Sequence, residues 1–294
     1  MEPNPLLRYT DAAGRSAGVV IARYSTSFGL ACRLLGPEER RHIANIYALV
    51  RVADEAVDGA AAAAGLDAVA VRDQLNRLEH ETETALLTGY STNMVVHAFA
   101  GTARVCGIGV DLTRPFFASM RADITVAEHT ADSLADYIYG SAEVVGLMCL
   151  RVFQTMPGAM PGRDDELAAA ARRLGSAFQN VNFMRDLAAD RDQLGRSYFP
   201  QSGAEAWDEQ RKHALVAEIR ADLAAAGRGI ALLPPGASTA VELAHALFSA
   251  LVNRLERIPA EELLSRRVRV GTPQKAAIAL RILARQRLRG RSAA

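Results

Sequence analysis

The sequence predicts an all-α protein, and three observations support this fold class. Apolar residues recur at helical spacing in almost every segment, alanine is abundant, and the alternating β-branched runs typical of strands are rare. In residues 38–57, for example, apolar side chains return every three or four positions, Pro37 precedes the stretch and Gly59 follows it. This pattern is typical of an amphipathic helix with a defined start and end.

Ten helices are expected, separated by stretches rich in glycine and proline. The turn-rich stretches are residues 107–109, 156–163, 195–203 and 234–236, and none is long enough for an interdomain linker. We therefore expect a single domain over residues 1–294, with disorder confined to residues 1–14 and 290–294. The expected helices cover residues 15–34, 38–57, 66–87, 92–106, 112–126, 133–153, 164–192, 208–227, 237–257 and 272–288.

The composition excludes several classes of protein. Lysine and arginine number 34 against 33 acidic residues in a chain of 294, so the strong positive charge typical of a nucleic-acid binder is missing. Three widely spaced cysteines exclude a disulfide scaffold and fit a reducing compartment. Because neither a secretory signal nor a membrane-spanning apolar run is recognisable, we expect a soluble, cytoplasmic protein.

Several common catalytic motifs are absent from the sequence. It contains no Gly-x-x-x-x-Gly-Lys phosphate loop, no dinucleotide-binding glycine fingerprint, no His-Glu-x-x-His zinc motif and no serine nucleophile elbow. The six histidines are scattered without metal-ligand spacing. If the chain is an enzyme, carboxylates are therefore expected to carry its chemistry.

Two segments carry paired carboxylates at helical spacing, and the first is residues 51–58. Asp54 and Asp58 lie four residues apart, so they share one helix face with Arg51. Their like charges destabilise an isolated helix by a few tenths of a kcal/mol, and Mg²⁺ is the natural compensating cation. Taken alone, however, such a pair is more often a solvated acidic face.

The second segment makes the functional interpretation the stronger one. Gln179, Asn182, Asp186 and Asp190 form a polar stripe on a helix whose other residues are largely apolar. A polar stripe on a mostly buried helix is costly unless it binds something. Carboxylate and amide oxygens suit Mg²⁺ that bridges to substrate phosphates, so two such helices facing each other predict a Mg²⁺–diphosphate site above an apolar cavity.

Together these motifs resemble the squalene/phytoene synthase family over nearly the whole chain. Members of this family are all-α and join two prenyl diphosphates head to head. The resemblance therefore implies a single-domain isoprenoid synthase fold, a helical bundle around a central apolar cavity. The segments that resemble the family are Tyr24-Ser-Thr-Ser27-Phe28, Tyr47-Ala-Leu-Val-Arg51, Asp54-Glu-Ala-Val-Asp58, Tyr137-Ile-Tyr139-Gly140-Ser-Ala142-Glu-Val-Val145-Gly146, Asn182-Phe-Met-Arg185-Asp186-Leu-Ala-Ala-Asp190 and Gly195-Arg196-Ser-Tyr198-Phe-Pro200.

The resemblance implies a role for particular residues of this sequence. Five oxygen-bearing side chains would bind Mg²⁺, with Mn²⁺ as an alternative: Asp54, Asp58, Asn182, Asp186 and Asp190. Four arginines would neutralise diphosphate oxygens: Arg51, Arg185, Arg196 and Arg267. Tyr198 joins the aspartates, Arg51 and Arg185 as an expected catalytic residue. Further substrate contacts are implied for Ser27, Phe28, Tyr47, Ala142, Val145, Gly146 and Gln179.

One helix of the resemblance has two interpretations. Ala142, Val145 and Gly146 fall on one face and would leave room for a prenyl chain, but close packing of two helices also selects small residues. Glu143 stands in this helix where relatives usually carry a small residue, and the sequence suggests no role for it.

The first interpretation of the activity is a phytoene synthase. Such an enzyme would convert two molecules of geranylgeranyl diphosphate, through a cyclopropylcarbinyl diphosphate, into phytoene for carotenoid biosynthesis, without a redox cofactor. The alternative is a squalene or presqualene diphosphate synthase that uses farnesyl diphosphate and needs NADPH if squalene is released. A remote alternative is a non-catalytic relative that binds lipid or assists assembly, although such a protein would be expected to lose the metal-binding aspartates.

The last thirty residues are basic and contain no acid after Glu262. Leucine and isoleucine alternate with arginine in residues 266–291, which is typical of an amphipathic helix on an anionic membrane and does not indicate a nucleic-acid site. A solvated surface helix is an equal alternative. The expected partners are thus prenyl diphosphates and the inner face of the cell membrane, for a monomer or a homodimer.

Overall fold

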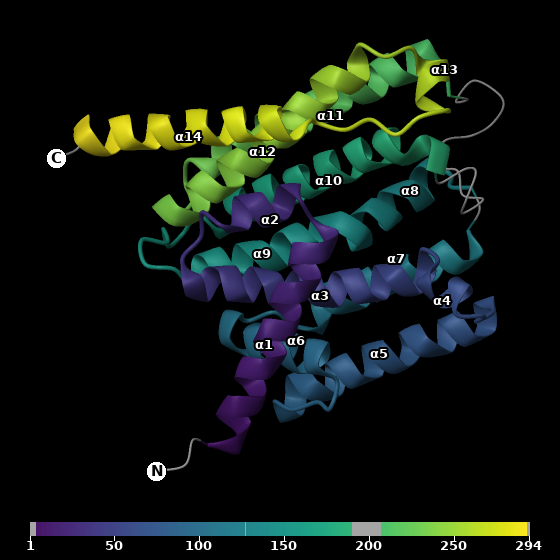
Figure 1. Cartoon of the computed structure of the whole chain (residues 1–294), viewed down its shortest axis with the longest axis vertical. Helices are drawn as coiled ribbons and strands as arrows, with labels where there is room; N and C mark the ends of the chain where they lie inside the picture. The colour runs from purple at the N-terminus through teal and green to yellow at the C-terminus, as the bar shows by residue number, and fades with distance from the viewer. Residues whose placement is uncertain (1–3, 127, 190–206, 293–294) are drawn as a thin grey trace.

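The computed structural model describes residues 4–126, 128–189 and 207–292, and every regular element in these ranges is a helix (Figure 1). The prediction of an all-α fold is confirmed. The elements are α1 (Pro5–Tyr24), α2 (Ser27–Cys32), α3 (Pro37–Val57), α4 (Ala60–Ala63), α5 (Ala68–Thr88), α6 (Met94–Cys106), α7 (Val110–Thr125), α8 (Ala131–Ile138), the π-helix η1 (Tyr139–Glu143), α9 (Val144–Gln154), α10 (Asp164–Ala189), α11 (Glu209–Ile230), α12 (Pro235–Glu256), α13 (Ala260–Leu263) and α14 (Thr272–Ser292).

The N-terminal helix begins at Pro5 and not at residue 15. The Asn4 side chain accepts a hydrogen bond from the Leu6 backbone N–H at 2.9 Å, and Pro5 occupies the first helical turn, so the start is capped. The expectation of disorder over residues 1–14 is therefore wrong for residues 5–14. The helix expected over 15–34 is also divided, because the chain leaves α1 after Tyr24 and re-enters a helix as the short α2.

Two buried clusters form the core on either side of the molecule's middle. One cluster joins α10, α11 and α12 with part of α14, and the other joins α3, α6, α7 and α9. In Figure 1, α11, α12 and α14 lie at one end of the long axis, α5 and α6 lie at the other, and α1 crosses in front of α3. This arrangement places α2, α3, α9 and α10 around the interior between the two clusters.

The helix that carries the small residues packs at backbone contact with its neighbours. A Cβ on Gly140 would lie 2.2 Å from the carbonyl oxygen of Pro115, and a Cβ on Gly146 would lie 2.7 Å from that of Ala171. Gly175 on α10 has the reciprocal contact, since its Cβ would lie 2.6 Å from the carbonyl oxygen of Ala142. Close helix packing therefore explains Gly146 directly. The helix expected over 133–153 is in fact α8, η1 and α9 in succession, with the π-helical turn at this contact.

The C-terminal helix packs mainly against α12 and extends to Ser292. Among the residues that the structure describes, no helix is both long enough and apolar enough to cross a membrane.

Candidate functional site

A large cavity lies between the two core clusters. Its volume is about 1480 Å³, which exceeds the range of about 300–1,000 Å³ usual for a small-molecule pocket. The walls come from α1, α2, α3, α7, α8, η1, α9, α10, α11, α12 and the start of α14, with the residues that connect α13 to α14. Twelve of the predicted site residues line it: Ser27, Phe28, Tyr47, Arg51, Asp54, Ala142, Val145, Gly146, Gln179, Asn182, Arg185 and Arg267.

The first carboxylate motif forms an ion-pair cluster at the end of α3. The Arg51 guanidinium donates to the Asp54 carboxylate at 2.6 Å and also pairs with Glu55. Burial in the cavity wall raises the pKa of Asp54 to about 8, and the negative charge of Asp58 acts in the same direction while Arg51 opposes it. Asp123 contributes further negative charge to this end of the cavity. The carboxylates gathered here therefore favour a bound cation.

In the second carboxylate motif, Asp186 forms ion pairs with two arginines. Asp186 accepts hydrogen bonds from the guanidinium of the adjacent Arg185 at 2.9 Å, and its carboxylate lies 2.7 Å from Nε of Arg267. Both arginines line the cavity, but Asp186 and Asp58 are not among the described lining residues. The remaining predicted residues, Asp190, Arg196 and Tyr198, lie outside the described residues.

Basic and hydroxyl side chains gather beside Arg185 and Arg267. The ammonium of Lys275, on α14, donates to the hydroxyl of Thr26 at 2.7 Å, joining segments separated by 249 residues. Burial lowers the pKa of Lys275, and the positive charges of Arg185 and Arg269 lower it further. A concentration of like charge of this kind is stabilised by a bound anion. Arg185 and Arg267 of this group are among the arginines that the resemblance implies as diphosphate contacts.

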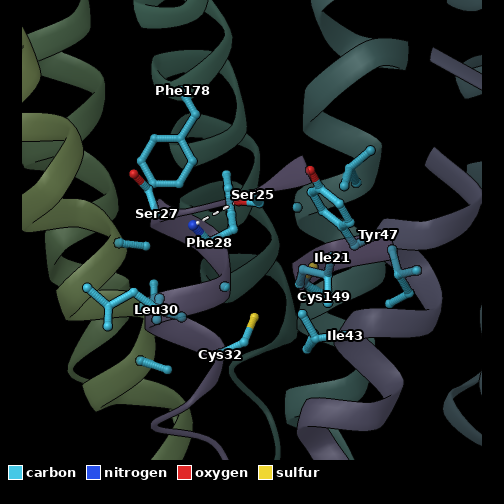
Figure 2. A pocket seen from close by; sticks show the side chains of 18 of the residues that line it. Ile21, Ser25, Ser27, Phe28, Leu30, Cys32, Ile43, Tyr47, Cys149 and Phe178 are labelled. Atoms are coloured by element: carbon cyan, nitrogen blue, oxygen red, sulfur yellow. Dashed lines mark hydrogen bonds between the residues drawn. The ribbon is translucent and has the colours of Figure 1, made fainter. Parts of the chain in front are cut away.

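Aromatic rings cover one wall of the cavity. Phe178 and Phe248 are stacked with ring centroids 3.8 Å apart, and Phe28 meets both rings edge-on at 5.7 and 5.9 Å. The Ser25 hydroxyl accepts a hydrogen bond from the Phe28 backbone N–H at 3.1 Å and so fixes the start of α2. Figure 2 shows Phe28 and Phe178 on one side of the cavity and Tyr47 on the other.

Sequence reasoning also missed a buried pair near the carboxylates of α3. The hydroxyl of Tyr137 donates to Asp123 at 3.0 Å, and both residues are buried. Tyr137 lines the cavity, and Asp123 is one of the charges that raise the pKa of Asp54. The pair thus connects the tyrosine-containing motif to the carboxylates of α3, a link that depends on the packing of α7 against α8.

The structure also gives Glu143 a role. Its carboxylate accepts a hydrogen bond from Nε of Arg172 at 2.6 Å, and the Arg172 guanidinium lies 5.1 Å from the centre of the Tyr139 ring. Glu143 therefore joins η1 to α10 on the outer side of the contact made by Gly175.

A preformed metal cage is not seen in residues 4–126, 128–189 and 207–292. No three of their histidine, cysteine, aspartate and glutamate side chains are grouped closely enough to surround a metal ion. Asp54 and Asp186 are instead separate carboxylates, and each is paired with arginine.

These features agree with the comparisons with known proteins. The family model described as squalene/phytoene synthase matches residues 21–274. The chain belongs to the squalene/phytoene synthase family.

Individual relatives show how far the similarity extends. Phytoene synthase 3, chloroplastic, from Zea mays is 32% identical over 206 residues, 70% of this chain but 46% of the maize protein. The chain thus spans less than half the length of that curated relative. The 15-cis-phytoene synthase of a Paracoccus species is 30% identical over 280 residues, with 88% of this chain and 86% of the relative covered. A crystal structure of a dehydrosqualene synthase has a TM-score of 0.73 at 18% identity, covering 97% of this chain and 99% of that one, which shows the shared fold.

Proposed function

We propose that this chain joins two molecules of geranylgeranyl diphosphate head to head and forms phytoene. The observation that carries the proposal is the polarity of the cavity, in which cationic and hydroxyl side chains gather at one end of an apolar volume of about 1480 Å³. Arginine and lysine bind diphosphate oxygens through charge-assisted hydrogen bonds, and a polyprenyl tail requires apolar space of this depth. The relatives named phytoene synthase support the choice of substrate.

The donor set fits Mg²⁺. This ion is usually bound by one or two carboxylates together with substrate phosphates and water, and a cage of protein ligands is not required. Asp54 and Asn182 reach the cavity, and Asp186 and Asp190 belong to the second motif, so these residues would bind the ion. When bound, Mg²⁺ supplies Lewis-acid stabilisation of the leaving diphosphate.

The side chains of the cavity account for the steps of the proposed reaction. Arg51, Arg185 and Arg267 would stabilise the charge that develops on the departing diphosphate, which leaves an allylic cation behind. The double bond of the second substrate attacks this cation, and loss of a proton gives a cyclopropylcarbinyl diphosphate. Loss of its diphosphate, rearrangement and loss of a second proton then give the hydrocarbon, with no electron donor needed. The rings of Phe28 and Phe178 would stabilise the cations and keep water away.

Product analysis tests the proposal and its alternative. The pure protein is incubated with Mg²⁺ and either geranylgeranyl or farnesyl diphosphate, with and without NADPH, and the hydrocarbons are identified. Phytoene from geranylgeranyl diphosphate without NADPH is expected. Formation of squalene or presqualene diphosphate from farnesyl diphosphate would identify farnesyl diphosphate as the substrate instead. If neither diphosphate gives a joined product, the proposed condensation is refuted.

A matched pair of arginine variants tests the diphosphate site. Arg267→Gln should lower kcat/KM by about 10- to 100-fold, because it removes a charged hydrogen-bond donor from the cavity. Arg220→Gln is the control, since Arg220 pairs with Glu256 at 2.6 Å on the exposed surface of α11. Equal activity of the two variants would contradict the assignment of Arg267.

A further inference from the structure

The cavity extends away from Lys275 to a second end, beside α1 and the start of α3. Its wall continues past Ile21 and Cys32 to one face of α1 and to the first turns of α3. Arg40 and Asp54 both line it, and the stretch of α3 between them is about 20 Å long at the usual rise per residue. Figure 2 shows Cys32 and Ile43 at the side of this interior away from Phe178.

Two glycines leave the gap between α1 and α3 open. A Cβ on Gly18 would meet no atom within 4 Å, and a Cβ on Gly14 would meet only the flexible side chain of Arg41, at 3.5 Å. The neighbouring Ile21 is buried in the wall, whereas Ala22 is exposed. The apolar interior therefore reaches solvent here between the two helices. We call this opening the α1–α3 mouth and define it by Gly14, Gly18, Pro37, Arg40 and Arg41.

The rim of the α1–α3 mouth is basic. Arg15, Arg33, Arg40 and Arg41 line the cavity and are exposed. Asp11 is the only acidic residue among the described lining residues at this end, and it pairs with Arg15 at 2.9 Å. The rim thus has a positive excess and surrounds an apolar opening, a combination that matches the anionic headgroups and acyl chains of a bilayer surface.

We propose that the apolar product leaves through the α1–α3 mouth, and that the arginine rim rests on an anionic phospholipid surface that receives it. The inference rests on the proposed function, because only a product without diphosphate needs such a route. Once both diphosphates have gone, the groups around Lys275 no longer attract the molecule. Exit past them would take a hydrocarbon across charged side chains into water, which is strongly unfavourable. Acyl chains at the other mouth provide an apolar medium.

A pair of glycine variants tests the exit route. Gly18→Phe fills the mouth. Gly18 lies within α1, and a Cβ there meets no atom within 4 Å, so the start of the new side chain displaces nothing. Gly101→Phe on α6 is the matched control, since its Cβ also meets nothing within 4 Å and the residue does not line the cavity. Single-turnover and steady-state rates of hydrocarbon formation are measured for both variants and the wild type. Gly18→Phe should retain the wild-type first turnover and lose about tenfold or more in the steady state, as expected when product release is slowed.

Two outcomes of this experiment would overturn the exit route. A normal steady-state rate in Gly18→Phe would show that product leaves elsewhere, and loss of the first turnover would show that the mouth serves the reaction itself. A wild type that joins no substrate would refute the proposed function instead, and this is seen before any variant is compared.

Vesicles of defined composition test the lipid surface. The steady-state rate of the wild type should rise with phosphatidylglycerol vesicles and rise less with phosphatidylcholine vesicles. The double change Arg40→Gln and Arg41→Gln should remove this difference and leave the single-turnover rate unchanged. Equal acceleration by the two lipids, or an unchanged difference in the double variant, would overturn the role of the rim.

Discussion

Replacing Gly146 by alanine decides between the two explanations of the small-residue helix. The new Cβ would lie 2.7 Å from the carbonyl oxygen of Ala171, and backbone cannot move aside without separating α9 from α10. Overpacking of this kind costs about 1–3 kcal/mol. Gly101→Ala is the reference, because its Cβ meets nothing within 4 Å and both variants gain the same helix propensity of about 1 kcal/mol. The difference between the variants is therefore the overlap alone, about 1–3 kcal/mol in favour of Gly101→Ala.

Urea unfolding followed by circular dichroism measures this difference. The two variants should have the same dependence on urea and different midpoints, with Gly101→Ala at or above the wild type and Gly146→Ala below Gly101→Ala. Equal midpoints would refute the packing explanation. If Gly146→Ala were as stable as Gly101→Ala but formed less product, the glycine would serve to leave space for the prenyl chain.

Three further predictions follow from the site and the surface. Chelation of metal should abolish activity until Mg²⁺ is restored. Asp54→Asn should lower turnover by about 100-fold or more without loss of stability, because the cost of burying the carboxylate and its repulsion by neighbouring carboxylates are both removed, and a destabilised variant would contradict this. Burial lowers the pKa of His42, so the unfolded chain binds a proton near pH 6.5 that the folded protein binds only at lower pH. Stability should therefore fall as the pH drops below about 6.5, and less steeply in His42→Gln, whereas parallel pH curves would exclude this histidine. On the outer face of α14, Leu280 is 68% exposed beside the exposed Arg281, so Leu280→Asp should weaken sedimentation with anionic vesicles and Leu87→Asp, at an 83% exposed site on α5, should not.

Local signals in the sequence predict most of the helices. The helix expected over 38–57 is α3, because its apolar spacing, Pro37 and Gly59 all act within the segment. The early start of α1 had a similar signal in Asn4-Pro5, which is a helix cap followed by a first-turn proline.

Contacts between distant segments explain what the sequence could not predict. The π-helical turn η1 depends on the approach of α7 to Gly140, and the Lys275–Thr26 hydrogen bond joins opposite ends of the chain. The polar stripe of α10 includes Gln179 and Asn182, which line the cavity. It could not show that Asp186 pairs with Arg267, because that arginine lies on a separate connection after α13.

The proposed head-to-head condensation is tested most directly by the ratio of diphosphate released to hydrocarbon formed. With Mg²⁺ and geranylgeranyl diphosphate, two diphosphates are expected for each phytoene, since each substrate loses its own. The ratio should stay constant as the enzyme concentration is varied. Release of diphosphate without any hydrocarbon, as in simple hydrolysis of the substrate, would contradict the proposed condensation.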